Sequence, residues 1–210
     1  MGKKYKCIIF DLDGTVLNTE RMNFIPLQRL IKEEQGIEVE YESLLKYKPY
    51  AGKKTLELLG FEEIENTYEK WVRYVNEFEE GALLFEGFDK VIKTLHENGI
   101  ICGIASSKMK KQYEIDFIPT GLHEYMQSVV LAEDTQNHKP HPEPLLKAIE
   151  LFDVRPEECI YIGDTILDFK SSKSAGMDFA LAIWGAADLT GIEADYNLSH
   201  PTDLLKELGL

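Results

Sequence analysis

The sequence predicts an α/β protein with a Rossmann-like, doubly wound parallel sheet and an inserted, small all-helical domain. Short, continuous apolar runs are typical of strands that are buried on both faces of a parallel sheet. Five such runs occur, at 7–10, 100–105, 128–131, 160–162 and 179–183. Helical patterns separate the later runs, and strands that alternate with helices form a sheet covered on both faces.

Three helical patterns alternate with these strands. In the first, apolar side chains recur at three- and four-residue steps, and Gly99 follows as a stop signal. These apolar positions are Phe88, Val91, Ile92 and Leu95. Pro144 is suited to open the second helix, because proline is tolerated in the first turn. The third helix is expected at about 166–175, with Gly176 at its end.

Residues 16–81 interrupt this alternation with helical patterns alone. One pattern begins near Met22 and ends at Gly36, and shorter ones occupy 41–48 and 53–59. A longer amphipathic helix is marked by apolar residues at helical spacing. These are Phe61, Ile64, Tyr68, Trp71, Val75 and Phe78. We therefore expect an inserted helical domain at 16–81 and an α/β core domain at 1–15 and 82–210.

The composition limits the partners. Lys and Arg number 23 against 37 Asp and Glu, a formal net charge of −14. Such a surface repels nucleic acid and anionic lipid, and no apolar run approaches the ~20 residues of a membrane span. A small anionic metabolite is compatible with this charge, because local lysines can reverse the field in a cleft. The three cysteines lack metal-ligand spacing, which favours buried, reduced thiols in a cytoplasmic protein. Oligomeric state is not set by these features.

Four polar motifs follow the first four apolar runs. They are Asp11-Leu12-Asp13-Gly14-Thr15, Ser106-Ser107, Lys139-Pro140 and Gly163-Asp164, the last with Asp168 one helical turn further on. In an open parallel sheet, ligands bind outside the carboxyl ends of the strands. We therefore expect these motifs to meet at one edge of the sheet, under the helical insert.

The first motif supplies a nucleophile and an acid–base group. Asp11 is expected to be ionised at neutral pH, and its carboxylate can attack phosphorus to form an aspartyl-phosphate intermediate. Asp13 can protonate the leaving oxygen and then activate water. Gly14 allows a sharp turn, and Thr15 is expected to hydrogen-bond locally and hold Asp13.

Clustered carboxylates call for a cation. Two like charges at ~4 Å repel by roughly 4 kcal/mol at an effective dielectric of ~20. An all-oxygen site that retains waters suits Mg²⁺. We expect Asp11 and Asp164 to bind it through their side chains, and Asp13 through its backbone carbonyl. Asp168 is expected to support the site by orienting Lys139 or the water shell of the metal.

The remaining motifs provide groups that bind phosphate. The Ser106 hydroxyl and the Ser107 amide can donate to phosphate oxygens, and Lys139 adds a fixed positive charge. In the insert, the segment 50–54 places Gly52 before two lysines, of which Lys53 is a candidate contact to a second anionic group of the substrate. The alternative, that these are exposed lysines at the start of a helix, is at least as well supported.

Each motif also has a non-catalytic interpretation. Asp-x-Asp-Gly occurs in calcium loops, but here Gly14 stands at loop position 4 rather than 6, and position 12 is Met22 rather than Glu. Asp164 alone could belong to an ordinary turn before a helix, and Lys139 alone could be a surface lysine. The combination and order of the four motifs favour catalysis.

In that order, the motifs resemble those of the haloacid dehalogenase-like hydrolases, in the phosphatase branch with a small helical cap. The nearest resemblance is to the group of phosphoglycolate phosphatases, pyrophosphatases and β-phosphoglucomutases. It implies a Mg²⁺-dependent phosphatase for a small phosphorylated metabolite. It also implies that 1–15 and 82–210 form the catalytic core and that the helical domain at 16–81 is a cap that closes over the site. Thr15 and the run Gly163-Asp164-Thr165 favour a phosphatase. The alternatives are a phosphomutase and a non-catalytic phospho-ligand binding module.

The resemblance does not name a substrate. Asn18-Thr19 replaces the Asp-Ser or Asp-Thr pair that is common in the group, and Ser106-Ser107-Lys108 differs from the Thr-Asn-Lys of many phosphoglycolate phosphatases.

Overall fold

The computed structural model describes residues 5–48, 50 and 52–210. The chain divides into two compact units, one of Met1–Asn18 with Leu84–Leu210 and one of Thr19–Leu83. These are called the α/β unit and the helical unit below. The two segments that join them, β2 (Leu17–Asn18) and β3 (Leu83–Leu84), pair as a two-stranded sheet. The role of the helical unit as a cap stays a prediction.

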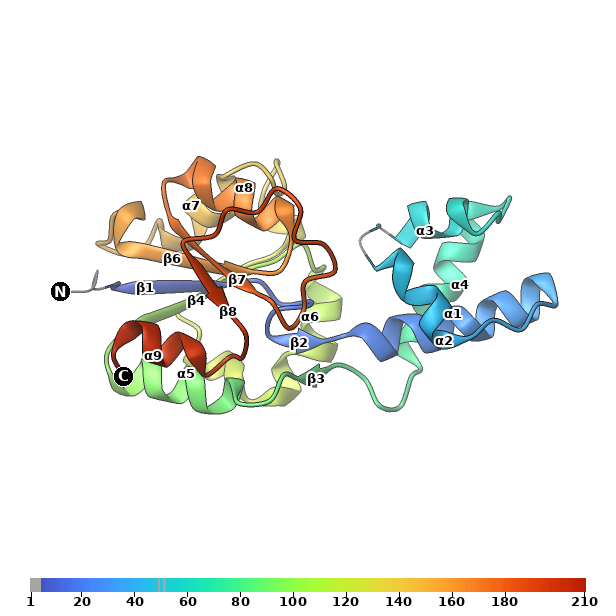
Figure 1. The fold of residues 1–210 in the computed structure, drawn as a ribbon, viewed down its shortest axis with the longest axis horizontal. Helices are drawn as coiled ribbons and strands as arrows, with labels where there is room; N and C mark the ends of the chain where they lie inside the picture. Colours follow the sequence, from blue (N-terminus) through green and yellow to red (C-terminus); the bar gives the residue numbers. More distant parts are fainter. Residues whose placement is uncertain (1–4, 49, 51) are drawn as a thin grey trace. The chain divides into compact units, whose positions relative to one another are not determined.

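The α/β unit is built on a parallel sheet of six strands, in the order β5-β4-β1-β6-β7-β8 (Figure 1). The strands are β1 (Cys7–Phe10), β4 (Ile101–Ala105), β5 (Ser128–Val130), β6 (Cys159–Gly163), β7 (Asp178–Ala182) and β8 (Tyr196–Leu198). β1 is central, and Cys7 pairs with Ile101 on one side and with Cys159 on the other. The predicted fold class is confirmed.

Helices cover both faces of this sheet. Figure 1 shows α7 (Glu143–Ile149) and α8 (Ile166–Ala175) on one face, and α5 (Phe88–Glu97) and α9 (Asp203–Leu208) on the other. α6 (Lys110–Asp116) follows β4. Short 3-10 turns occupy Ile118–Thr120, Leu122–Tyr125, Ala132–Asp134 and Pro156–Glu158. α8 ends at Gly176 as the sequence predicts, with that glycine in the left-handed conformation.

The apolar runs form the core as expected. On the α7 and α8 face, Cys7, Ile9, Tyr161 and Phe179 are buried together with side chains of α7. On the other face, the ring of Phe10 packs edge-on against Phe88. All three cysteines are buried and free, as predicted. The central strand β1, which leads to Asp11, therefore packs against other side chains on both of its faces.

The helical unit has a core of its own. It contains α1 (Glu20–Gln35), α2 (Tyr41–Leu44), a 3-10 turn at Leu45–Tyr47, α3 (Gly52–Leu58) and α4 (Ile64–Asn76). Leu27, Leu30, Leu56 and Trp71 pack at its centre. α4 is shorter than the apolar pattern suggested, because Phe61 lies in the turn after α3, where its amide donates to the Leu56 carbonyl.

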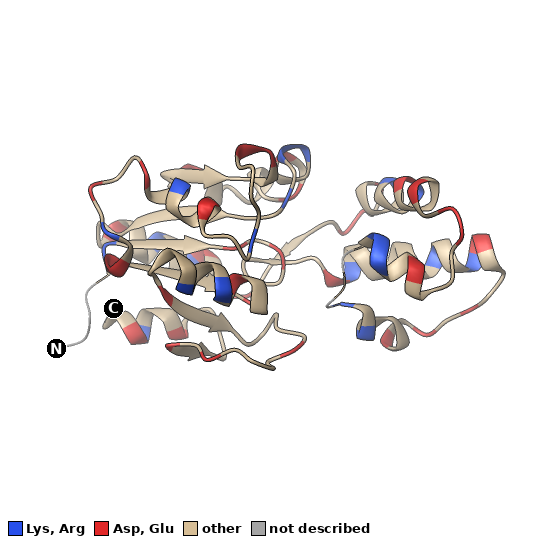
Figure 2. Cartoon of the chain, turned by 90° about the horizontal axis from the view of Figure 1, so that it is seen from above, with Lys and Arg blue, Asp and Glu red and all other residues tan. Residues whose placement is uncertain are grey.

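Charged residues are distributed along the helices of both units (Figure 2). Among the described residues, no helix combines the length and the apolar character needed to cross a membrane.

Candidate active site

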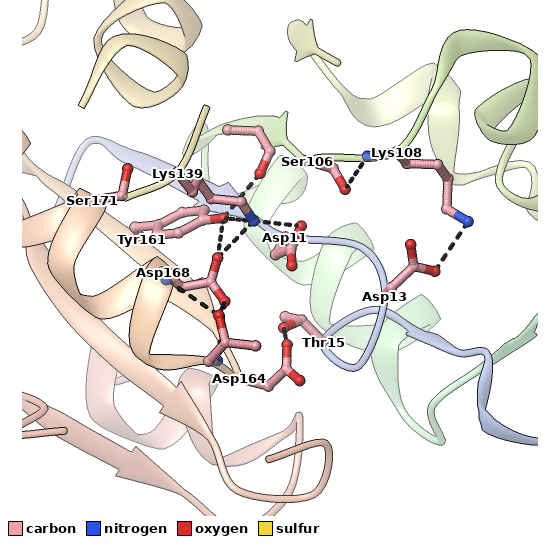
Figure 3. A network of polar contacts seen from close by, with 12 residues as sticks. Asp11, Asp13, Thr15, Ser106, Lys108, Lys139, Tyr161, Asp164, Asp168 and Ser171 are labelled. Carbon is pink, nitrogen blue, oxygen red and sulfur yellow. Dashed lines mark hydrogen bonds and ion pairs between the residues drawn. The ribbon is translucent and has the colours of Figure 1, made fainter. Parts of the chain in front are cut away.

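The polar motifs meet at the carboxyl edge of the sheet. Asp11 directly follows β1, Ser106 follows β4 and Asp164 follows β6, while Lys139 lies in the loop between β5 and α7. Parallel neighbouring strands end at the same edge, so residues that are more than 150 positions apart in sequence come into one cluster (Figure 3).

Lys139 lies at the centre of this cluster. Its Nζ is 3.1 Å from Asp11 Oδ1 and 2.6 Å from Asp168 Oδ1. Burial disfavours the charged form of Lys139, but the two carboxylates outweigh it and raise the pKa of the ammonium group. Lys139 is therefore a permanent positive charge next to Asp11.

Asp168 is the most firmly held carboxylate of the group. Oδ1 faces Lys139, and Oδ2 accepts hydrogen bonds from the amide and the hydroxyl of Thr165, 3.0 and 2.5 Å away. Burial alone would raise the pKa of Asp168, yet Lys139 and Thr165 lower it below its ordinary value. Both oxygens are thus engaged, which suits Asp168 to orient Lys139 rather than to bind a ligand.

Tyr161 adds a contact that the motifs did not indicate. Its hydroxyl accepts a hydrogen bond from Lys139 Nζ at 3.1 Å and lies 2.9 Å from the Ala105 carbonyl oxygen. The only signal in the sequence is a hydroxyl-bearing residue inside the aliphatic run of β6. A buried tyrosine hydroxyl needs a partner, and here it helps to fix the lysine.

The negative charges of the Asp11 and Asp164 carboxylates are not fully balanced by nearby positive groups. Burial raises the pKa of Asp11 to about 6, although Lys139 acts in the opposite direction. Burial also raises the pKa of Asp164 well above its ordinary value, and the negative charges of Asp168 and Asp11 add to this. The cluster therefore contains one lysine and three buried carboxylates, so negative charge is in excess.

A metal ion fits this deficit. One carboxylate oxygen from each of Asp11, Asp164 and Asp168 can be chosen so that all lie within 4.8 Å of one another. The donor set is all oxygen, which is typical of Mg²⁺ and similar hard cations. Asp168 already contacts Lys139 and Thr165 through both of its oxygens, whereas Asp11 and Asp164 have fewer partners.

Gly14 permits the close approach of the first motif to Asp164. It has a φ of +79°, and a Cβ atom at this position would lie 2.3 Å from Asp164 Oδ2. Gly185 also packs closely against the loop that contains Gly14, since a Cβ atom at Gly185 would lie 1.6 Å from the Gly14 carbonyl oxygen. The neighbouring Trp184 donates from Nε1 to the Thr15 carbonyl oxygen at 2.9 Å. Only glycine fits at either position.

The contacts of Thr15 and Asp13 differ from the expectation. The Thr15 hydroxyl donates to Asp164 Oδ1 at 3.2 Å, whereas the sequence suggested that it would hold Asp13. The Asp13 carboxylate instead forms an ion pair with Lys108. Thr15 therefore contacts a residue that directly follows β6 and lies 149 positions further along the chain. Lys108 was not assigned to the site from the sequence.

The two serines of the second motif have different surroundings. Ser106 is buried, its amide donates to the Val130 carbonyl, and its hydroxyl accepts from the Lys108 amide at 3.3 Å. Ser107 is exposed at the start of the loop. Both serines follow β4, which ends at Ala105, and so lie at the carboxyl edge of the sheet. Their binding of phosphate stays a prediction.

The expected cap contacts lie in the helical unit. Gly52 begins α3 and packs against Tyr68, because a Cβ atom there would lie 2.7 Å from the Tyr68 ring. Lys53 forms an exposed ion pair with Glu65 at 2.6 Å. Ala51, within the same predicted segment, lies outside the described residues. A substrate contact by Gly52 or Lys53 stays a prediction.

This fold and this site define a hydrolase class. Residues 8–182 match the family model described as haloacid dehalogenase-like hydrolase, and this span includes all four motifs. The chain belongs to that family, as the resemblance predicted, and it is an enzyme of the hydrolase type.

One curated relative and two solved structures are similar to this chain over nearly its whole length. The chain is 31% identical over 207 residues to a protein named Pyrophosphatase PpaX from Bacillus cereus (strain B4264), with 94% of each chain covered. A putative phosphoglycolate phosphatase from Lactobacillus plantarum has a similar structure, with a TM-score of 0.84 at 24% identity, covering 97% of this chain and 99% of the other. A β-phosphoglucomutase from Clostridium difficile shares the fold with a TM-score of 0.72 at 19% identity, covering 98% and 97%.

Proposed function

We propose that this protein is a Mg²⁺-dependent phosphatase that hydrolyses a small phosphorylated compound through an aspartyl-phosphate intermediate. The observation that supports this most directly is the position of Asp11, which ends the central strand, next to a buried lysine and two further carboxylates. A carboxylate nucleophile beside a fixed cation is what phosphoryl transfer to an enzyme side chain requires.

In the first step, a carboxylate oxygen of Asp11 attacks phosphorus, and the bond from phosphorus to the leaving oxygen breaks. Asp13 gives its proton to that leaving oxygen, so the product departs as a neutral hydroxyl group or a protonated phosphate. Lys139 offsets the negative charge on the phosphoryl oxygens while the phosphoryl group moves. The Ser106 hydroxyl and the Ser107 amide donate hydrogen bonds to the same oxygens.

In the second step, water attacks the phosphorus of the aspartyl phosphate. The bond from phosphorus to the Asp11 oxygen breaks, which restores the carboxylate and releases inorganic phosphate. Asp13 accepts the proton that the water loses and returns to its starting state. Each turnover thus consumes one water molecule and leaves both aspartates unchanged.

The metal is assigned to the carboxylates that lack compensation. The side chains of Asp11 and Asp164, with the backbone carbonyl of Asp13, would hold Mg²⁺, and Asp168 supports the site through Lys139. When bound, the ion supplies positive charge that reduces repulsion between the carboxylates and an incoming phosphate.

We assign the helical unit, expected at 16–81, as the cap that covers the site during turnover, with Gly52 and Lys53 as candidate substrate contacts. Pyrophosphate is the first substrate to test, since the relative at 31% identity carries the name Pyrophosphatase PpaX. The acidic chain, with its formal net charge of −14, supports a small metabolite rather than nucleic acid or membrane as the partner.

The test is phosphate release from pyrophosphate and a panel of phosphorylated metabolites, with Mg²⁺ or with EDTA. We expect release only with Mg²⁺, and a fall of about a thousandfold or more in Asp11→Asn, because the nucleophile is removed. Asp153→Asn, a change at an exposed aspartate in a turn after α7, is the matched control and should retain full activity.

Other outcomes point elsewhere. Interconversion of sugar phosphates with a bisphosphate primer, without release of phosphate, would identify a phosphomutase. Binding of a phosphorylated ligand by a folded protein that never turns it over would identify a binding module.

A further inference from the structure

Lys108 is a second buried lysine that bridges two carboxylates, as Lys139 does, and the sequence assigned it no role. Its side chain is only 6% exposed, and Nζ lies 3.0 Å from Asp13 Oδ1 and 2.6 Å from Asp116 Oδ2. Figure 3 shows the side chain extending across the loop to Asp13. Burial opposes the charge of Lys108, but the two carboxylates raise its pKa, so it remains an ammonium group.

Asp116 anchors this lysine. Asp116 is the last residue of α6, its side chain is 1% exposed, and Gln112 Nε2 donates to its Oδ1 at 2.8 Å. The backbone of Lys108 is also fixed, because its amide donates to Ser106 Oγ and its carbonyl accepts from the Ala132 amide. The ammonium group therefore occupies one defined position above the first motif.

Asp13 is held on one side only. Its side chain is 43% exposed, yet Oδ1 is buried against Lys108. In Figure 3, the other carboxylate oxygen points away from the lysine. An aspartate on a turn has several staggered χ1 rotamers, and the ion pair selects one of them. The oxygen that faces away is then free to exchange a proton with substrate or water.

We propose that Lys108, anchored by Asp116, is a positioning residue that fixes the Asp13 carboxylate in the orientation needed for proton transfer. This rests on the proposed function, in which Asp13 acts as the acid and base. General acid–base catalysis contributes about 10²- to 10⁴-fold, and only when the group lies within hydrogen-bond reach of the proton. Loss of the anchor therefore reduces the rate even though Asp13 itself is retained.

The alternative role of Lys108 is direct binding of phosphate, as proposed for Lys139, which is buried between two carboxylates in the same way. The two roles differ in their kinetic effect: a lysine that only binds substrate acts on KM, whereas a positioning residue acts on kcat through Asp13.

Lys108 and Asp116 can be removed together so that Asp116 does not remain as a buried, unpaired charge, while Asp13 keeps contact with solvent through a side chain that is 43% exposed. Replacing both partners of a buried ion pair by apolar residues is often neutral or stabilising, whereas removing one partner destabilises. The double variant Lys108→Met/Asp116→Leu is therefore the principal test, with Lys108→Met alone for comparison. Lys111→Met, at an exposed position of α6, is the matched control.

The kinetic measurement separates positioning from binding. We expect the double variant to lose about 10- to 100-fold in kcat, with KM changed by less than about threefold, and Lys111→Met to match the wild type. In an Asp13→Asn background the same pair of changes should cost nothing further, because residues that act through one group are not additive. Multiplicative losses in that background, or a rise in KM without a fall in kcat, would overturn the inference in favour of substrate binding.

A second readout does not depend on activity. A crystal structure of the wild type should show the Asp13 side chain in one rotamer. A crystal structure of the double variant should show it in several rotamers. An Asp13 carboxylate that keeps its place without Lys108 would overturn the inference even if the enzyme were active. Absence of turnover in the wild type, by contrast, would count against the proposed function and would leave the structural result to decide the role of Lys108.

Discussion

Ion pairs at the sheet edge of the α/β unit and those of the helical unit have opposite surroundings. At the sheet edge, Lys139 and Asp168 are 7% and 0% exposed. In the helical unit, Lys53 and Glu65 are 50% and 73% exposed, and the pair of Lys54 with Glu57 is similarly open. The separations of the charged atoms are nevertheless alike, between 2.6 and 2.8 Å.

The difference shows that distance does not decide what an ion pair does. An exposed pair typically contributes about 0–1 kcal/mol, since water screens it and two flexible side chains must be ordered. In a buried pair both charged groups lose their hydration, so the pair gives little net stability. Removal of one partner, however, leaves the other as a buried charge without an opposite charge beside it. Buried pairs therefore fix geometry at the site, while the exposed pairs keep a helical surface hydrated.

Asp168→Asn should produce the largest change in stability. The carboxylate compensates Lys139 and accepts two hydrogen bonds from Thr165. We expect the free energy of unfolding to fall by about 3–5 kcal/mol, measured by urea denaturation. Activity should fall as well, because Lys139 loses its anchor. A loss below about 1 kcal/mol would mean that this buried pair behaves like a surface pair.

Mg²⁺ should stabilise the α/β unit, because Asp11 and Asp164 lack compensating charge. At a metal concentration of about 100 times Kd, linkage gives about 2.7 kcal/mol, visible as a higher Tm than in EDTA. In Asp164→Asn this shift should be strongly reduced. The same variant should be more stable than the wild type in EDTA, since one of three repelling carboxylates is gone. An unchanged shift in Asp164→Asn would contradict the assignment of this ligand.

Two tryptophans allow a matched comparison between the units. Trp184 Nε1 donates to the Thr15 carbonyl oxygen and Trp71 Nε1 to the Asn23 carbonyl oxygen, both at 2.9 Å. Trp184→Phe and Trp71→Phe should each lower the free energy of unfolding by about 1–2 kcal/mol, because each leaves a carbonyl without its donor. Only Trp184→Phe should also lower kcat, since it loosens the loop that carries Asp13. An equal effect of both variants on kcat would refute this distinction.

Lys54→Met and Lys53→Met should have the smallest effects on stability, below about 0.5 kcal/mol each by thermal unfolding, because both pairs are exposed. The two variants differ in their expected kinetics. If Lys53 contacts the substrate, its removal raises KM, whereas removal of Lys54 leaves KM unchanged. Identical kinetics in the two variants would remove Lys53 from the candidate substrate contacts.

Much of the fold follows from local pattern. The five apolar runs correspond to five strands within one or two residues at either end, and α8 has the predicted bounds. The strand β8 was not predicted, because it has only three residues and includes the polar Asn197. α6 was also missed, since most of its residues are polar and few are buried. Short elements of this kind are stabilised by neighbours that periodicity does not record.

The site was predictable only in part, for a related reason. That Asp11, Lys139, Asp164 and Asp168 lie together could be predicted, because they come from strand ends at one edge of the sheet or from the segments that follow them. Their roles in catalysis stay predictions. Tyr161 and Asp116 were not found, because a tyrosine in an apolar run and an acid in a polar helix look ordinary. Thr15 lies beside the carboxylate cluster, but its partner is Asp164 rather than the predicted Asp13.

By itself, the sequence determined the parallel sheet, the insertion of a helical unit after the first strand, and the edge at which the polar motifs meet. These depend on the spacing of apolar residues and on the direction of strands, which are properties of neighbours along the chain. Only the tertiary structure decided that Lys139 bridges Asp11 and Asp168, and that Lys108 bridges Asp13 and Asp116. Such contacts depend on how side chains from separate elements share a buried space, where a lysine without carboxylates beside it would be too costly to keep charged.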